Sequence, residues 1–350
     1  MTDQRFTVHA PGRVNLIGDH TDYAGGLALP CAIDLGITLH AERGGTEILL
    51  TSDAFGGNVV INLTDVAEIQ TFEPFWGRYV AAVAQECAAT NGFRGLVTST
   101  LPAGAGLSSS AALEISLAVA MQFNGSPLEL ALMGQRSEHR AVGVPCGLLD
   151  QLSIVFGKQD HAMVIDFSDN AIDHVAFPED LDIVIMHSGQ VRELVDSEYA
   201  ERRSMCEQAA QRIGPLANAS LTEIATVDGD LKRRARHVVS ECERVRQAAV
   251  ALRENDPATF GQLMLQSHSS LRDDFDVSTS VLDDLVEFIG DSVIVAHNAR
   301  FDMGFIQSSL ERDGRPRLTN KVVDTVSLAR RLVRNEVPNC KLSTLAESLG

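Results

Sequence analysis

A stretch rich in glycine and serine, residues 101–112, constrains the fold of this chain more than any other segment. It reads Leu-Pro-Ala-Gly-Ala-Gly-Leu-Ser-Ser-Ser-Ala-Ala, and it follows a β-rich segment at 95–100. An Ala- and Leu-rich run at 111–121 comes next and predicts a helix. Gly104 and Gly106 let the backbone turn sharply, because no Cβ is in the way. The sequence therefore predicts a strand, a tight turn and a helix in succession.

A turn of this kind is typical of anion-binding sites, because the first N–H groups of a helix are free to donate to a bound anion. The hydroxyls of Ser108, Ser109 and Ser110 add donors for phosphate oxygens and a possible oxygen ligand for Mg²⁺. The alternative is an ordinary loop that caps a buried helix, and this segment alone does not decide between the two. A P-loop is excluded, because the chain contains no G-x-x-x-x-G-K-[ST] motif.

A second polar cluster lies near the start of the chain, within residues 10–26. Arg13 is a fixed cation with a fork of donors, and Asp19, His20 and Asp22 are suited to binding sugar hydroxyls. The alternatives are a surface ion pair for the arginine and a solvated turn for the acidic residues. The residues that precede the polar tip are apolar, which favours a binding site over a solvated turn.

A third candidate is Asp150, which follows a turn rich in glycine and proline and lies among apolar residues. It is either a helix cap or a buried functional carboxylate, and its local sequence by itself favours the cap. Periodicity predicts the elements around these motifs. The predicted helices are 76–91, 127–141, 192–213 and 230–253, and the predicted strands are 5–9, 36–41, 46–51, 162–167 and 182–187. The two glycines between 36–41 and 46–51 predict that these strands form a β-hairpin.

The composition narrows the class of protein. A chain of 350 residues with 45% hydrophobic and 22% charged residues is typical of a soluble globular protein of about two domains. It has no apolar run of about 20 residues and no signal-peptide pattern, so we expect a cytoplasmic protein. The six cysteines are scattered, which favours reduced thiols over a zinc site or disulfides. The net charge of −18 makes nucleic acid an unlikely partner.

The three motifs together resemble the galactokinases. Residues 12–23 resemble the galactokinase signature, and 102–112 resemble the ATP loop of the wider family of galactokinase, homoserine kinase, mevalonate kinase and phosphomevalonate kinase. Residues 146–151 are similar to the galactokinase segment that bears the catalytic aspartate, and 197–206 to a further one. The resemblance runs in order from about residue 5 to about residue 285. It implies an α+β, two-lobed kinase that binds ATP between its lobes and phosphorylates D-galactose at the C1 hydroxyl, giving galactose 1-phosphate and ADP.

The resemblance also implies a role for each matching residue. Asp150 would lie near the C1 hydroxyl as a base or electrostatic partner, and Arg13 would stabilise charge on the transferring phosphoryl group. Galactose would be held by Asp19, His20, Thr21, Asp22, Gly147 and Tyr199. The ATP phosphates would be held by Gly104, Ala105, Gly106, Leu107, Ser108, Ser109 and Ser110, and Mg²⁺ by Ser110 and Glu138. Galactokinases usually carry glutamate where this chain has Asp19, so the exact sugar stays open.

The likeness to kinases stops before the C-terminus. The third family motif, another glycine-rich loop, is absent, and residues 293–302 instead resemble the second motif of proofreading-type 3′–5′ exonucleases. Residues 291–350 carry 9 basic and 7 acidic side chains, whereas residues 1–290 carry 20 and 40. Asp302 matches only one of the four carboxylates that the nuclease chemistry needs, so we expect no two-metal centre.

These observations predict three segments: an N-terminal kinase lobe with the sugar and ATP motifs (1–180), a partial C-terminal lobe (181–288) and an exonuclease-like fragment (289–350). They predict a monomeric galactokinase. A sensor that binds galactose and ATP without turnover is one alternative, because the third motif is missing. A nucleic-acid enzyme acting through 291–350 is the other, and the acidic charge and the missing ligands argue against it.

Overall fold

The structure is a computed structural model of the chain, and it does not describe every residue. It describes residues 4–277, except 66–67, 103, 144–145, 179–180, 182, 184 and 186–194, together with 294–296 and 322–324. Residues Met1–Val277 form one compact unit and Ser278–Gly350 a second. In the second unit the described residues are two short parallel strands, β8 (Ile294–Ala296) and β9 (Val322–Asp324).

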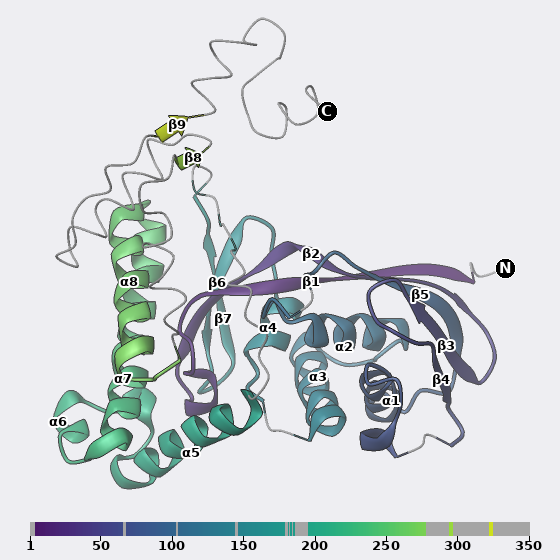
Figure 1. Cartoon of the computed structure of the whole chain (residues 1–350), viewed down its shortest axis with the longest axis horizontal. Helices are drawn as coiled ribbons and strands as arrows, with labels where there is room; N and C mark the ends of the chain where they lie inside the picture. The colour runs from purple at the N-terminus through teal and green to yellow at the C-terminus, as the bar shows by residue number, and fades with distance from the viewer. Residues whose placement is uncertain are drawn as a thin grey trace, which may run out of the picture. The chain divides into compact units, whose positions relative to one another are not determined.

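The first unit is built on a seven-stranded sheet (Figure 1). Its strands are β1 (Arg5–Ile17), β2 (Leu27–Arg43), β3 (Glu47–Ser52), β4 (Val59–Asn62), β5 (Phe93–Ser99), β6 (His161–Asp166) and β7 (Ala171–Ala176). They lie in the order β4-β3-β5-β2-β6-β7, and β1 pairs with β2. The pair β3–β5 is parallel and the other pairs are antiparallel. Strand β2 pairs with β5 at one end and β6 at the other, so it joins the two halves of the sheet.

The predicted hairpin between 36–41 and 46–51 is wrong. Both strands exist, but β5 lies between them and pairs with each. The backbone of Gly92 bonds to both turn glycines: its oxygen accepts from Gly44 and its N–H donates to Gly45, each at 2.9 Å. Alternating apolar residues determine which face of a strand is buried, but they do not determine which strand pairs with it.

The described chain also contains eight helices. They are α1 (Gly77–Glu86), α2 (Ser109–Ala120), α3 (Pro127–Val142), α4 (Leu149–Val155), α5 (Val195–Ile213), α6 (Leu221–Ile224), α7 (Gly229–Arg253) and α8 (Pro257–Asp273). Three short 3₁₀ turns are η1 (Asp22–Ala24), η2 (Ile69–Thr71) and η3 (Leu216–Asn218). Helices α1, α2, α3, α5 and α7 confirm the helices predicted from periodicity, whereas the strand predicted over 182–187 lies mostly outside the described residues.

Two large apolar clusters stabilise the first unit. One lies between α1 and α2 and the strands β2 to β5, and includes Leu39 and Leu113. The other lies among α5, α7 and α8 and the strands β1, β2, β6 and β7, and includes Leu29, Val245 and Phe275. The long strands β1 and β2 run through both clusters, so each of these two strands packs against both clusters. The predicted α+β class is confirmed.

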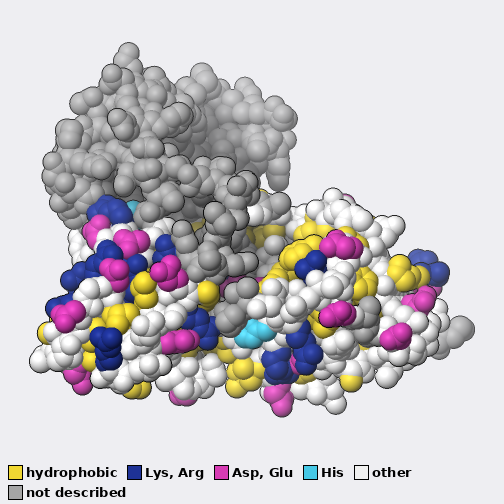
Figure 2. Space-filling view, turned by 60° about the horizontal axis from the view of Figure 1, so that its bottom comes forward, with side chains coloured by type: hydrophobic (Ala, Val, Ile, Leu, Met, Phe, Trp, Pro, Cys, Tyr) yellow, Lys and Arg dark blue, Asp and Glu magenta, His cyan; other side chains and the backbone are white. Residues whose placement is uncertain are grey.

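Several charged side chains on the surface of the described residues form ion pairs. On the face shown in Figure 2, basic and acidic side chains are intermixed over the described residues. Glu86, for example, forms ion pairs with Arg136 (2.7 Å) and Arg140 (2.6 Å). No helix in the described part of the chain is long and apolar enough to span a bilayer. The five described cysteines are free thiols, and Cys340 lies outside the described residues.

Candidate active site

A pocket of about 580 Å³ lies where β1, the loop before α2 and the turn before α4 meet. It gathers residues from segments that are far apart in the sequence. All but one of the predicted site residues line it: Arg13, Asp19, His20, Asp22, Gly104, Ala105, Gly106, Leu107, Ser108, Ser109, Ser110, Glu138, Gly147, Asp150 and Tyr199. The structure thus places the sugar, phosphate and acid motifs of the sequence in one cavity.

Asp150 lies in the first turn of α4, with both carboxylate oxygens bound to side chains of the pocket. Its Oδ1 accepts from Arg13 Nε at 2.8 Å and from Nη2 at 2.6 Å, and its Oδ2 accepts from the Ser108 hydroxyl. The helix-cap interpretation is wrong, because the N-cap of α4 is Leu148. The carboxylate side chain is 28% exposed, so a small molecule in the pocket can reach it.

Arg13 connects Asp150 to the glycine-rich loop before α2. Strand β1 carries it, and its remaining guanidinium nitrogen, Nη1, donates to the backbone oxygen of Gly106 at 2.7 Å. Its backbone N–H donates to the oxygen of Leu107 at 3.2 Å. A guanidinium bound on both sides has one position, so the cation stays between the acid and the loop.

The loop before α2 has the backbone shape expected of an anion site. Gly104 and Gly106 have φ of 70° and 72°, and Ser108 is in the left-handed region at 60°. Ser108 is the N-cap of α2, yet its hydroxyl makes no capping bond and donates to Asp150 instead. A loop that served only to cap the helix would direct this hydroxyl at the first turn. The arrangement favours the anion-site interpretation over the capping loop.

Glu138 on α3 faces the start of α2 across the pocket. Its Oε1 accepts from the Ser110 hydroxyl at 2.9 Å, and its Oε2 accepts from Gln151 Nε2 at 2.8 Å and from the Cys146 thiol at 3.2 Å. Burial raises the pKa of Cys146, and the charge of Glu138 adds to the effect, so the thiol stays protonated. The Ser110 and Glu138 oxygens are a pair of hard ligands on neighbouring helices, which fits Mg²⁺ better than a softer metal.

The polar loop between β1 and β2 forms another wall of the pocket. Asp22 packs against the turn before α4 so closely that a Cβ on Gly147 would lie 1.4 Å from its Oδ2. Burial raises the pKa of Asp22 to about 6; the backbone N–H of Tyr23 opposes the shift and the charge of Asp150 adds to it. The ring of Tyr199, from α5, lies 5.7 Å from the ring of His20. Acidic and aromatic groups therefore line this wall.

Thr21 is the predicted residue that does not line the pocket. Its side chain is fully buried, and its hydroxyl lies 2.8 Å from the backbone oxygens of both Gly18 and Leu27. Its position gives it a role in holding the loop, not in contacting a ligand. Asn15 lines the pocket without having been predicted, and neither of its buried amide atoms has a hydrogen-bond partner among the described residues. Its spacing of two from Arg13 on a strand could have indicated it.

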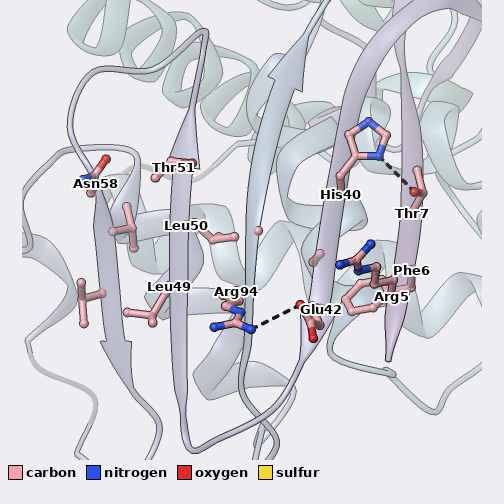
Figure 3. A pocket seen from close by; sticks show the side chains of 14 residues that line it. Arg5, Phe6, Thr7, His40, Glu42, Leu49, Leu50, Thr51, Asn58 and Arg94 are labelled. Atoms are coloured by element: carbon pink, nitrogen blue, oxygen red, sulfur yellow. Dashed lines mark hydrogen bonds and ion pairs between the residues drawn. The ribbon is translucent and has the colours of Figure 1, made fainter. Parts of the chain in front are cut away.

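A second hollow, of about 840 Å³, lies on the sheet face formed by β1 to β5 (Figure 3). It contains an ion pair of Arg94 with Glu42 at 3.3 Å and a hydrogen bond between Thr7 and His40 at 3.0 Å. Leu49, with 40% of its surface exposed, lies in its floor. None of the residues predicted from the motifs lines it, so the chemistry is concentrated in the first pocket.

Fold and pocket together define a kinase of the GHMP class. The model of the GHMP kinase N-terminal domain matches residues 76–158, and the galactokinase galactose-binding signature matches residues 2–43. A galactokinase from Lactococcus lactis, solved in complex with galactose, is 33% identical with a TM-score of 0.76, over 82% of this chain and 80% of that one. The chain belongs to the galactokinase family.

More distant structures share the fold alone. Mevalonate kinase from Methanococcus jannaschii is 18% identical with a TM-score of 0.54, over 82% of this chain and 84% of that one. Mevalonate kinase from L. major, solved with R-mevalonate, is 17% identical with a TM-score of 0.53, over 82% and 81%. The signature match and the Lactococcus lactis structure confirm the resemblance of the motifs to galactokinases. The resemblance of the C-terminal segment to exonucleases stays a prediction, and Asp302 lies outside the described residues.

Proposed function

We propose that this protein phosphorylates D-galactose at its C1 hydroxyl with ATP, giving galactose 1-phosphate and ADP. The observation that carries the proposal is Asp150, held by Arg13 and Ser108 between the acidic loop and the glycine-rich loop. Asp150 has a fixed cation beside it. It lies between the acidic loop, suited to sugar hydroxyls, and the glycine-rich loop, suited to phosphate, and this arrangement suits phosphoryl transfer to a sugar. The galactose bound in the Lactococcus lactis relative supports this choice of substrate.

On the sugar side, Asp19, His20 and Asp22 would bind galactose hydroxyls together with Gly147 and Tyr199. Carboxylates accept hydrogen bonds from hydroxyls, and these bonds are among the stronger neutral-to-charged contacts. Asp19 is one methylene shorter than the glutamate usual in galactokinases. The identity of the sugar is therefore the part of the proposal that depends most on the position of this loop.

On the nucleotide side, the loop 104–110 and the first turn of α2 would hold the ATP phosphates. The chain carries a net charge of −18, so local donors must overcome the general repulsion of a polyanion. Ser110 and Glu138 would hold Mg²⁺. The described residues contain no cluster of three or more metal-binding side chains, and Mg²⁺ commonly takes its other ligands from phosphate and water. When bound, the ion would neutralise charge on the phosphate oxygens.

Within this arrangement Asp150 would orient the C1 hydroxyl and accept its proton or stabilise the charge that forms there. Arg13, 15% exposed, would stabilise negative charge on the transferring phosphoryl group. Phosphoryl transfer needs positioning and charge stabilisation more than covalent participation, and these two side chains supply both. We also propose that the protein works as a monomer in the cytoplasm.

The test is release of ADP from Mg-ATP with and without galactose. We expect galactose-dependent release from the unmodified protein, and a loss of about 10²- to 10⁴-fold in Asp150→Asn, the range for removing a positioned acid–base group. ADP binding should persist in that variant. Asp173→Asn is the matched control, because Asp173 on β7 is an exposed partner of Arg253 outside the pocket. Unchanged turnover in Asp150→Asn would refute the assignment, and binding of both ligands without turnover in the unmodified protein would favour the sensor.

A further inference from the structure

We propose that helix α7 positions the sugar loop, residues 18–22, through two buried side chains, Glu241 and His237. Both are positioning residues: neither lines the pocket, and each contacts the backbone of the loop. The inference rests on the proposed function, since it assigns a role in galactose binding. It concerns residues that follow the loop by more than 200 positions and that no motif of the sequence includes.

The sugar loop has a backbone shape that needs external support. Gly18 has φ of 103°, and a Cβ there would lie 2.5 Å from the Cα of Ala28. His20 has φ of 61°, which is unusual for a residue with a side chain. Such conformations persist only where the surrounding structure holds them, and they are frequent at ligand sites. The hydroxyl of Thr21 supports the loop from within, and α7 supports it from outside.

Glu241 is the first of the two contacts from α7, and it is fully buried. Its Oε1 accepts from the backbone N–H of Gly18 at 2.9 Å and from the hydroxyl of Ser267 on α8. Its Oε2 accepts from Arg244 Nε at 2.7 Å, and Nη2 of the same guanidinium lies 2.5 Å away in an ion pair. A buried carboxylate is stable only when it is paired and hydrogen-bonded, and this one is. Its contact with the loop is thus a charge-assisted bond in a dry environment.

His237 is the second contact, one turn earlier on the same face of α7, and it too is fully buried. Its Nε2 lies 3.0 Å from the backbone oxygen of Asp19, and its Nδ1 lies 2.9 Å from the hydroxyl of Ser270. A carbonyl oxygen can only accept, so Nε2 carries the hydrogen and Nδ1 of the neutral ring accepts from Ser270. Burial lowers the pKa of His237, which keeps the ring neutral.

An aromatic contact supports the side chain of His20 in the sugar loop. Phe275, just after α8 and fully buried, has its ring 4.6 Å from the rings of both His20 and His237. Arg202 holds the backbone of Phe275 by donating to its oxygen at 3.0 Å. Phe275 therefore supports the side chain of His20, whereas α7 supports the backbone of the loop. In Figure 1 the turn between β1 and β2 (purple) lies beside α5 and α7.

This support matters most for Asp19. Its carboxylate has one methylene less than the glutamate usual in galactokinases, so its reach depends more on where its backbone lies. The bond from His237 holds the carbonyl of that residue directly. The proposed nucleotide groups come from the loop 104–110, the start of α2 and Glu138 on α3, and no hydrogen bond of α7 among the described residues reaches them. Loss of the support should therefore weaken sugar binding and leave nucleotide binding unchanged.

The experiment compares three substitutions of histidine in the full chain. His237→Leu removes the donor to Asp19, His237→Gln keeps an N–H near the position of Nε2, and His268→Leu is a control on α8. Titration calorimetry with galactose should show a dissociation constant about tenfold higher in His237→Leu, as expected for one lost hydrogen bond, and substantial recovery in His237→Gln. The constant for ADP should stay within about twofold in all three, because the lost bond reaches only the sugar loop.

Unfolding curves and amide exchange complete the test. If His237→Leu does not fold, Ser270→Ala removes the partner of Nδ1, together with a longer bond of 3.4 Å to Asp274 Oδ2. We expect a smaller loss of galactose affinity in the same direction. Unchanged galactose affinity in the folded variants would overturn the inference while the proposed function stands. If the unmodified protein does not bind galactose, the proposed function fails. Exchange of the amides of 18–22 then decides the inference: it should be faster in His237→Leu and unchanged over 104–110, and equal exchange in both proteins would refute it.

Discussion

Gly147→Ala tests the sugar wall of the pocket with one added carbon atom. The new Cβ would lie 1.4 Å from Asp22 Oδ2 and 2.3 Å from its Cγ, whereas ordinary contact begins at 3.4 Å. The carboxylate must therefore move by about 2 Å, the difference between 3.4 and 1.4 Å. Asp22 belongs to a loop held on both sides, so its side chain has to turn out of its present position.

The expected magnitude follows from the bond that is lost. A hydrogen bond to a charged group contributes about 1.5–3 kcal/mol, which corresponds to about a 10- to 150-fold increase in the dissociation constant for galactose. A displacement of about 1 Å at a reacting centre can also reduce turnover by about 10²-fold. The affinity for ADP should not change, because Ser108, Ser109 and Ser110 lie on the other wall.

Calorimetric titration with galactose and with ADP measures the two dissociation constants. Gly56→Ala is the matched control, since a Cβ at that position meets nothing within 4 Å. An unfolding curve for each variant separates a local effect from a loss of fold. A galactose dissociation constant within about twofold of the unmodified protein would refute the reasoning, because a moved Asp22 would then contribute nothing to binding.

Two further predictions concern pH. Burial raises the pKa of Asp22 from 3.8 to about 6, so the carboxylate that would accept sugar hydroxyls is lost as the pH falls through 6. Galactose affinity should therefore decrease between pH 7 and pH 5, and Asp22→Asn should bind weakly and with little pH dependence over that range; a parallel decrease in Asp22→Asn would assign the effect elsewhere. Burial raises the pKa of Glu114 well above 4.5, and the charge of Glu138 adds to it. A folded-state pKa above the unfolded value means that stability is lost as the pH rises above 4.5, so Glu114→Gln should increase the free energy of unfolding at pH 8 and not at pH 4. Denaturant titrations measure this, with Glu129→Gln as a control of opposite sign: the Ser126 backbone and hydroxyl lower the pKa of Glu129, so its contribution is present above 4.5 and removing it should not stabilise at pH 8. A stabilisation of equal size at both pH values would contradict the assignment for Glu114.

Helix α7 illustrates what sequence reasoning missed. Its many arginines and glutamates suggest a solvated face without a function, yet Glu241 and His237 are fully buried. The buried apolar positions Val238, Cys242 and Val245 recur at the spacing of a helix, and both polar residues fall within that stripe. Polar residues inside an apolar stripe are the signal that the sequence offers. Their partners, the backbone of Gly18 and Asp19, could not be found that way.

Asp150 gives a second example. The sequence places it after a tight turn, and in that local context a helix cap is the commoner role. Its actual partners, Arg13 and Ser108, are 137 and 42 positions away. Only the motif resemblance indicated a functional carboxylate, because no short-range pattern encodes contacts across such separations.

The sequence by itself determined the local structure: the turn at Gly104 and Gly106, the helix that follows it, and the order of the three motifs. These depend on the φ and ψ preferences of neighbouring residues and on apolar periodicity, which short segments express. The tertiary structure decided what pairs with what. It put β5 between β2 and β3, turned Thr21 into the interior, and brought α7 against the sugar loop. Periodicity selects the face that is buried, whereas the neighbour on that face is selected by packing and backbone hydrogen bonding over the whole unit.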